Sequence, residues 1–399
     1  MNRSALITSL DCPSLTHPLH MSPTITVFMH RMCLVLAWIA LSVGPAAAQF
    51  PTASPIEAGL DPARLDAAVA LYRKAVAEDA VMRGALLVVV KDGRVVLEEC
   101  IGWHDVEARV PFTPDTLFHL ASNTKAYIGA SVQMLAEEGR LRLDDPVGRW
   151  LPAFARKEFT GMTVEHLVTH TSGLPASPIL LPGTRKDSTL RAEAARFAKE
   201  LKLVSKPGET YLYSNAGYNV LGAVVEAASN TRLAAFLRAR IFDPLGMKNT
   251  YCHEPEVEPG RLGPIYRRAG NGWLREESNK PRYPIVRASG GLISSARDQI
   301  AWVQMFLDHG RSRENRLLSE AGIDAILTRR VAVTDDPATG YGYGWRIHAD
   351  GSFSHGGSDG TYVWVDPQTR MFALMFTQSP AREQPRTTFC KALKASVVK

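Results

Sequence analysis

The segment HLASNTKAYIGASVQMLAEEG, residues 119–139, constrains the fold more than any other, because it is an apolar helix that carries a lysine. Its periodicity predicts a helix from about Asn123 to Glu138, and Gly139 is a natural stop. Small and apolar residues surround Lys125, so we expect the helix to be buried. A buried ammonium needs either a partner or a reason to lose its proton.

A serine, Ser122, stands three residues before Lys125, and side chains at this spacing share one face of a helix. A lysine held in apolar surroundings favours its neutral form and can accept a proton. A serine hydroxyl becomes a good nucleophile when a neighbour takes its proton. The pair is therefore a candidate nucleophile and base. The alternative is a serine near a helix cap and a lysine whose ammonium reaches solvent.

Two further motifs carry polar groups in unusual settings. In GETYLYSNAGYNVLG, Tyr213 and Asn215 precede a predicted helix, which Asn215 or the serine before it could cap. The functional interpretation is a tyrosine that shuttles protons and an amide that orients substrate. In SFSHGGSDGTYVWV, the run His355-Gly356-Gly357 lies in a predicted strand. Glycines there indicate close approach of a ligand or another backbone, or simply a tight turn between edge strands.

The order of predicted elements indicates an α/β (α+β) protein. Residues 49–160 and 285–399 mix helices with strand-like runs, and Asp92-Gly93 between two apolar runs predicts a hairpin. Residues 161–284 are mainly helical segments separated by loops rich in Pro and Gly. The simplest architecture is an antiparallel sheet flanked by helices, with an all-α domain inserted midway.

Together these motifs resemble the serine β-lactamase and penicillin-binding-protein superfamily, and most closely its class C β-lactamase-like branch, which includes esterases and D-amino-acid-specific peptidases. The family motifs Ser-x-x-Lys, Tyr-x-Asn and Lys/His-x-Gly occur here in the family's order. The segments LVTHTSGLP (167–175) and SGGLISSARDQ (289–299) add to the likeness, which runs from about residue 57 to the end. The resemblance implies a β-lactamase/transpeptidase-like fold.

The resemblance also implies roles for particular residues. Ser122 would be the acylated nucleophile, and Lys125 and Tyr213 would share its proton transfers. The groups that would bind substrate or the oxyanion are Asn215, His355, Gly356, Gly357 and the backbone N–H groups of Ser122 and Ser358. Water would complete the reaction by deacylation, and no metal or cofactor is implied.

The third motif departs from that of true β-lactamases, which carry a lysine and a hydroxyl residue there to grip a substrate carboxylate. His355 is at most partly charged near pH 7, and Gly356 has no hydroxyl. We therefore expect an esterase that acts on small acyl esters. A D-aminopeptidase or amidase is the second choice, and a β-lactamase or DD-peptidase is less favoured. A non-catalytic protein that kept the fold is the alternative of another class.

A decoy motif also occurs in this region. The stretch GGSDG, residues 356–360, matches the Gly-x-Ser-x-Gly elbow of α/β-hydrolases, with Ser358 as its nucleophile. The elbow needs a helix after the serine, whereas TYVWV after residue 360 predicts a strand. The sequence favours Ser122 over Ser358 as the nucleophile.

The N-terminus resembles a secretory signal. From Met29 it has a basic start, an apolar run over residues 32–43, and three alanines that end at Ala48. We expect cleavage after Ala48 and an exported protein, periplasmic or secreted, without a transmembrane anchor. Translation could begin at Met21 or Met29.

The charge and the cysteine content bear on possible partners and on disulfide bonds. The net charge of +6 is dispersed, without a basic run, which argues against a nucleic-acid partner. Beyond the signal remain Cys100, Cys252 and Cys390, which allow one bridge or three free thiols. The expected partner is a small ester, amide or lactam substrate, and the sequence leaves the oligomeric state open.

Overall fold

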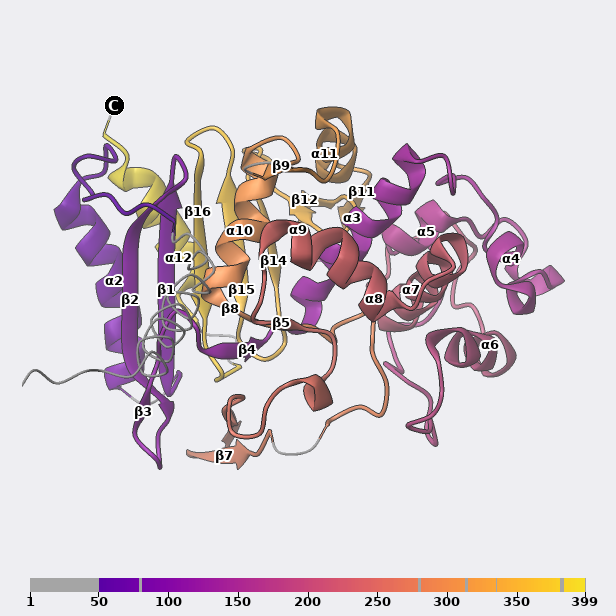
Figure 1. The fold of residues 1–399 in the computed structure, drawn as a ribbon, viewed down its shortest axis with the longest axis horizontal. Helices are drawn as coiled ribbons and strands as arrows, with labels where there is room; N and C mark the ends of the chain where they lie inside the picture. Colours follow the sequence, from indigo (N-terminus) through magenta and orange to yellow (C-terminus); the bar gives the residue numbers. More distant parts are fainter. Residues whose placement is uncertain are drawn as a thin grey trace, which may run out of the picture. The chain divides into compact units, whose positions relative to one another are not determined.

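The largest sheet among the described residues has nine antiparallel strands (Figure 1), in the order β11-β12-β13-β14-β15-β16-β1-β2-β3. The computed structural model describes residues 50–78, 81–278, 281–312, 315–334, 336–380 and 384–398, so the predicted signal sequence lies outside the described residues. The strands are β1 (Gly84–Lys91), β2 (Arg94–Asp105), β3 (Val110–Pro111), β11 (Val331–Val333), β12 (Asp336–Tyr341), β13 (Arg346–Ile347), β14 (Phe353–Gly356), β15 (Tyr362–Asp366) and β16 (Met371–Phe376). The first and last parts of the chain thus share one sheet, as β1 pairs with β16.

The predicted hairpin is confirmed. Lys91 pairs with Arg94, so Asp92 and Gly93 form a two-residue turn. Both have positive φ, 51° and 73°, as a turn compatible with the twist of the strands requires. Aspartate and glycine are among the residues that best adopt that conformation, which explains the turn signal in the sequence.

Helices cover both faces of the sheet. Along β1, Leu86 and Val88 face one core, while Leu87 and Val89 face the other. Helices α2 (Pro62–Ala77) and α12 (Arg386–Ser396) pack on the second face through a shared apolar core that includes Tyr72, Phe389 and Leu393. Because both faces are buried, β1 reads as a continuous apolar run instead of an alternating one.

The other face carries α10 (Ala296–Leu307), which also contacts α3 (Thr124–Glu137). Trp302 of α10 stacks on Tyr127 of α3 with ring centroids 3.9 Å apart. The predicted helix over residues 123–138 is confirmed, and twelve of its residues, Lys125 among them, are buried. Helix α3 therefore links the sheet to the helical part of the protein.

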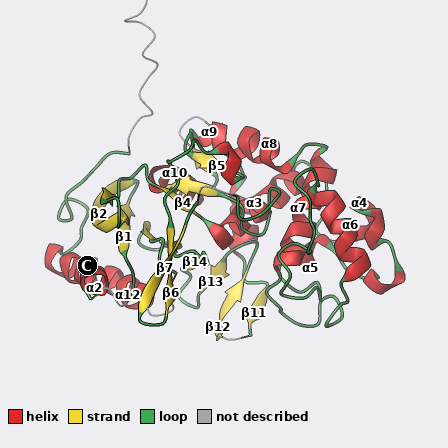
Figure 2. Cartoon of the chain, turned by 90° about the horizontal axis from the view of Figure 1, so that it is seen from below, coloured by secondary structure: helices red, strands yellow, loops and turns green. Residues whose placement is uncertain are grey.

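The helical part gathers at one end of the sheet, as Figure 2 shows for α4 to α7. Its helices are α4 (Val147–Trp150), α5 (Val164–Val168), α6 (Leu190–Glu200), α7 (Asn215–Ser229), α8 (Leu233–Leu237) and α9 (Asp243–Leu245), and a π-turn (Arg238–Phe242) joins the last two. Helix α7 is buried on nearly all sides and contacts α3, α5 and α6. The remaining helix, α11 (Glu320–Leu327), also contacts α3.

The all-α region expected over residues 161–284 ends earlier than predicted. After Leu245 the chain forms β5 (Thr250–Tyr251) and a hairpin of β6 (Ile265–Ala269) and β7 (Gly272–Glu276). The hairpin follows from the turn residues Gly270-Asn271 between two short runs that contain aromatic residues. Charged residues within those runs obscure the alternation of apolar and polar residues that predicts a strand.

A small three-stranded sheet supports the start of α3. It joins β4 (Leu117–His119), β8 (Ile293–Ser295) and β5 in the order β4-β8-β5. The end of β4 lies three residues before Ser122. Three distant segments of sequence therefore fix the position of the serine.

Two further observations concern the described residues. No single helix among them has the length and apolarity to cross a membrane, although the bent pair Asn215–Ser229 and Leu233–Leu245 passes that test together. The three cysteines are free thiols, of which Cys252 and Cys390 are buried and Cys100 is exposed.

We predict that Gly129→Ala destabilises the protein. A Cβ at Gly129 would lie 2.2 Å from the carbonyl oxygen of Tyr343, so the backbone before β13 would have to move away from α3. We expect the free energy of unfolding in urea to fall by about 1–3 kcal/mol. Gly272→Ala is the control, because its nearest neighbour would lie 3.8 Å away. Equal effects of the two changes would contradict this packing.

Candidate active site

Ser122 lies in a tight turn that leads into α3. The turn is a single 3₁₀ segment, Ala121–Asn123, and the side chain of Ser122 is half-buried. Ala121 has φ of +47°, a left-handed conformation that costs a residue with a Cβ about 1–2 kcal/mol. Two hydrogen bonds at Leu120 hold the turn. The Leu120 N–H donates to the Leu292 carbonyl oxygen, and the Asn123 N–H donates to the Leu120 carbonyl oxygen. These contacts offset the backbone strain at Ala121.

Lys125 lies in the interior next to that serine. Its side chain is completely buried, and its Nζ is 3.1 Å from Ser122 Oγ. Two other segments supply acceptors: Asn215 Oδ1 at 3.0 Å and the Ser289 carbonyl oxygen at 2.6 Å. None of these three partners is a carboxylate. The predicted Ser–Lys contact is thus present, and the lysine does not reach solvent.

The partners of Lys125 can satisfy a neutral amine. Burial, aided by the positive charge of Arg287, lowers the pKa of Lys125 well below its usual value. A neutral amine has two N–H donors and one lone pair. The Asn215 and Ser289 oxygens can only accept, so they take the two N–H groups. The lone pair is then left for the Ser122 hydroxyl, which is the arrangement a base needs.

Tyr213 is the second residue whose side chain lies next to Ser122. Its side chain interacts with that of Ser122, and Lys125 Nζ lies 4.6 Å from the centre of its ring. Burial raises the pKa of Tyr213, so the phenol stays protonated. Helix α7 begins just after it, and Ser214 provides the cap by accepting from the Gly217 N–H at 2.9 Å. Asn215 is therefore free to face Lys125.

His355 lies on β14 and is neutral. Burial and the nearby Lys125 lower the pKa of His355 to about 3. Its Nε2 is 3.2 Å from the Tyr341 hydroxyl, and its Nδ1 is 3.0 Å from the Gly356 carbonyl oxygen. The rings of His355 and Tyr213 have centroids 6.4 Å apart. The hydrogen-bond partner of His355 Nε2 is thus Tyr341, which the sequence motifs do not indicate.

His170 also lies beside Tyr213. It is buried, its Nδ1 accepts from the Ser214 N–H at 3.0 Å, and its ring centroid is 4.3 Å from that of Tyr213. Burial lowers its pKa well below the usual value. The motif LVTHTSGLP marked the residue, but nothing in the sequence named Tyr213 as its neighbour.

The glycine loop after β14 packs directly on the serine turn. A Cβ at Gly357 would lie 2.4 Å from the Leu120 carbonyl oxygen, so only glycine fits there. Asn123 Nδ2 donates to Thr361 Oγ1 at 3.0 Å, which ties the two segments together. Ser358, between them in the loop, is exposed. Strand β15 follows it instead of a helix, so the elbow interpretation of GGSDG is wrong.

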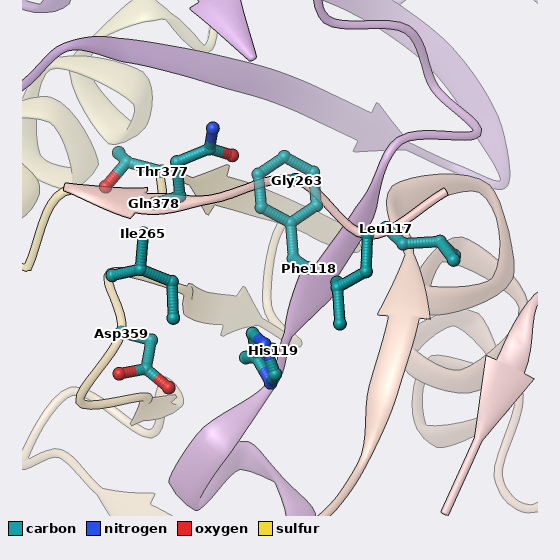
Figure 3. Close-up of a pocket in the computed structure, with 9 residues that line it drawn as sticks. Leu117, Phe118, His119, Gly263, Ile265, Asp359, Thr377 and Gln378 are labelled. Carbon is teal, nitrogen blue, oxygen red and sulfur yellow. The ribbon is translucent and has the colours of Figure 1, made fainter. Parts of the chain in front are cut away.

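A small pocket adjoins these segments without containing the predicted site (Figure 3). Its volume is about 10 Å³, room for about one water molecule. The lining residues are Leu117, Phe118, His119, Leu262, Gly263, Ile265, Asp359, Thr377 and Gln378. None of the residues singled out from the sequence is among them. This pocket is too small for an organic substrate.

The fold and the site define a class of protein. A serine that contacts a buried lysine and a tyrosine, where an antiparallel sheet meets a helical region, is the arrangement of serine hydrolases that act through a covalent intermediate. A model of the Beta-lactamase family matches residues 68–389. The chain belongs to this family, within the serine β-lactamase and penicillin-binding-protein superfamily, as the motifs indicated.

Similar proteins carry names that state different activities or none. Protein Rv1367c of Mycobacterium tuberculosis is 28% identical over 358 residues, which cover 76% of this chain and 87% of that protein. Esterase EstB of Burkholderia gladioli is 37% identical over 239 residues, which cover 55% of this chain and 58% of the esterase. The structure of D-amino acid amidase from Ochrobactrum anthropi SV3, in complex with L-phenylalanine amide, has a TM-score of 0.69 at 25% identity, over 83% of this chain and 99% of that chain.

We predict that Lys125→Met strongly slows the acylation of Ser122 without loss of stability. Because the pKa of Lys125 is lowered on folding, the unfolded chain binds that proton more tightly. The lysine therefore costs stability below about pH 10.4, and the cost shrinks as pH rises toward that value. At pH 7 we expect the variant to be at least as stable as the parent in urea, and its acylation by a fluorophosphonate to be about 10³-fold slower.

The control for this prediction is Lys74→Met, because the Lys74 side chain is 75% exposed. We expect it to change neither quantity. If Lys125→Met instead lost about 3 kcal/mol or more, the lysine would be a charged group held by stabilising contacts.

Proposed function

We propose that the protein is a serine hydrolase that forms an acyl-enzyme on Ser122 and acts best on small acyl esters. The observation that carries the proposal is the 3.1 Å contact between Ser122 Oγ and a buried lysine without a carboxylate partner. A buried lysine whose pKa is lowered can remove the serine proton as the ester carbonyl is attacked.

The steps follow from the groups around Ser122. Lys125 takes the hydroxyl proton while Oγ bonds to the carbonyl carbon of the ester. The backbone N–H groups of Ser122 and Ser358 are proposed to hold the resulting oxyanion, since the loop of Ser358 packs on the serine turn. The proton passes to the departing alkoxide through Tyr213, whose side chain interacts with that of Ser122. Water then attacks the acyl carbon and gives a proton to Lys125. The bond between that carbon and Oγ breaks, Oγ takes the proton back from Lys125, and the acid leaves.

The preference for uncharged esters rests on the third motif. His355 is neutral, and Gly356 offers no hydroxyl, so these two positions provide no cation or hydroxyl to grip a substrate carboxylate. The likeness to an esterase at 37% identity supports the same class of substrate. Efficient hydrolysis of β-lactams or of peptides with a free carboxyl end is therefore not expected.

The second candidate is an amidase or D-aminopeptidase, which the likeness to a D-amino acid amidase favours. An amide differs from an ester because its leaving nitrogen must be protonated before it departs. Tyr213 lies next to Ser122, where such a proton donor is needed. A non-catalytic role is disfavoured, because both Lys125 and Tyr213 contact Ser122.

We predict that the protein from Gln49 onward hydrolyses a short-chain nitrophenyl ester and that Ser122→Ala lowers kcat/KM by about 10³-fold or more. The matched control is Ser358→Ala, which removes a hydroxyl but keeps the backbone N–H. We expect the control to retain most of the activity. Turnover that survives loss of Ser122 but not of Ser358 would overturn the assignment of the nucleophile. Turnover of a D-amino acid amide alone would favour the second candidate.

We also propose that the protein is exported, on the signal-like pattern of residues 29–48. Expressed in a bacterial host with its own N-terminus, it should be recovered outside the cytoplasm and begin at Gln49. N-terminal sequencing of the recovered protein checks this. A cytoplasmic product that retains residues 29–48 would contradict export.

A further inference from the structure

The shortest contact of Lys125 is with a main-chain atom. The Ser289 carbonyl oxygen lies 2.6 Å from Nζ, closer than either side-chain partner. Two glycines, Gly290 and Gly291, follow Ser289, and glycines restrain the backbone least. Something must therefore fix the peptide units on either side of Ser289 if this carbonyl is to point at the lysine.

Asn219 meets that requirement on the side before the carbonyl. Its Oδ1 accepts from the Ser289 N–H at 3.0 Å, and its Nδ2 donates to the Ile179 carbonyl oxygen at 2.7 Å. The side chain is buried, so both ends of the amide are used within the protein. On the other side, Arg287 Nη2 donates to the Gly290 carbonyl oxygen at 2.9 Å.

The position of Asn219 on α7 suits this task. It lies four residues after Asn215, so the two amides share one face of the helix. Asn215 accepts directly from Lys125 Nζ, and Asn219 holds the residue that supplies the other acceptor. One helical face thus determines both groups that take the N–H donors of the lysine.

We propose that Asn219 is a positioning residue that holds the Ser289 carbonyl against Lys125 and so directs the lone pair of the lysine at Ser122. The inference rests on the proposed function, since it assigns a role in the same proton transfer. Without Asn219, the segment 289–291 would be held by Arg287 from the side after the carbonyl, and the peptide before the carbonyl would lose its anchor. Lys125 would then lose an acceptor, and the angle of its lone pair to Ser122 Oγ would no longer be fixed.

The charged and titratable groups that face Lys125 come from four segments. They are Tyr213 and Tyr218, with ring centres 4.6 and 5.4 Å from Nζ, together with His170, His355 and Arg287. The pKa values of both tyrosines are raised by burial and those of both histidines are lowered, so these four stay neutral near pH 7. A pH dependence of Ser122 acylation near neutrality therefore reports on Lys125.

The test measures acylation of Ser122 by a fluorophosphonate as a function of pH, followed by intact mass, in the parent and in Asn219→Leu. A carbonyl acceptor stabilises an ammonium more than an amine, so its loss lowers the proton affinity of the lysine. We expect the acid limb of the variant to move to lower pH by about one unit, and its plateau rate to fall by about 10- to 100-fold. With an ester substrate, kcat should fall more than KM rises.

The matched control is Gln299→Leu. Gln299 is also a buried amide with two hydrogen bonds, to Tyr127 and Ser294, but it does not contact Lys125 or Ser289. It should lose stability without moving the acid limb. If Asn219→Leu does not fold, Asn219→Ser, whose hydroxyl is too short to reach the Ser289 N–H, carries the same expectation.

Two results would overturn the inference in distinguishable ways. If the Asn219 variants share the acid limb of the parent and of Gln299→Leu, Asn219 is merely structural while the proposed function stands. If the parent itself is not acylated at Ser122 at any pH, the proposed function fails, and the inference fails with it.

Discussion

The contact between Lys125 Nζ and Ser122 Oγ is the interaction on which the rest of the site depends. It places an amine in the interior without a carboxylate to balance a positive charge. Burial of such a group costs less free energy if it gives up its proton and its N–H groups find acceptors. Helix α3 supplies the lysine and the turn before it the serine, while α7 and the segment at Ser289 supply the two remaining acceptors. The packing of α3 against both the sheet and α7 is what brings these segments to one point.

The same physics explains the character of the residues around this contact. A carboxylate beside Lys125 would keep the amine charged and useless as a base. The neighbours are instead tyrosines that burial keeps protonated and histidines that burial keeps neutral. Burial strengthens the hydrogen bonds among these neutral groups. The absence of a cation at position 355 belongs to this pattern, and it separates the site from one built to bind a carboxylate.

Much of this could be predicted from the sequence because side-chain chemistry and spacing carried it. The hairpin at Asp92-Gly93, the buried helix and the Ser–Lys contact all follow from local pattern. The remaining parts depend on tertiary contacts that leave no local trace. A main-chain carbonyl such as that of Ser289 has no residue-type signal, so its role as a lysine partner was invisible. Tyr341 lies on β12 and its partner His355 on β14, with β13 between them, so only the three-dimensional structure reveals the contact.

The most direct test of this account is the pKa of Lys125 itself. It can be measured by NMR on protein with carbon-13 at the lysine ε positions, with the signal assigned by its loss in Lys125→Met. The account predicts a titration well below the ordinary value of about 10.4, with the amine neutral at pH 8. A titration near 10.4, with the ammonium intact at pH 8, would contradict the claim that Lys125 is the base that activates Ser122.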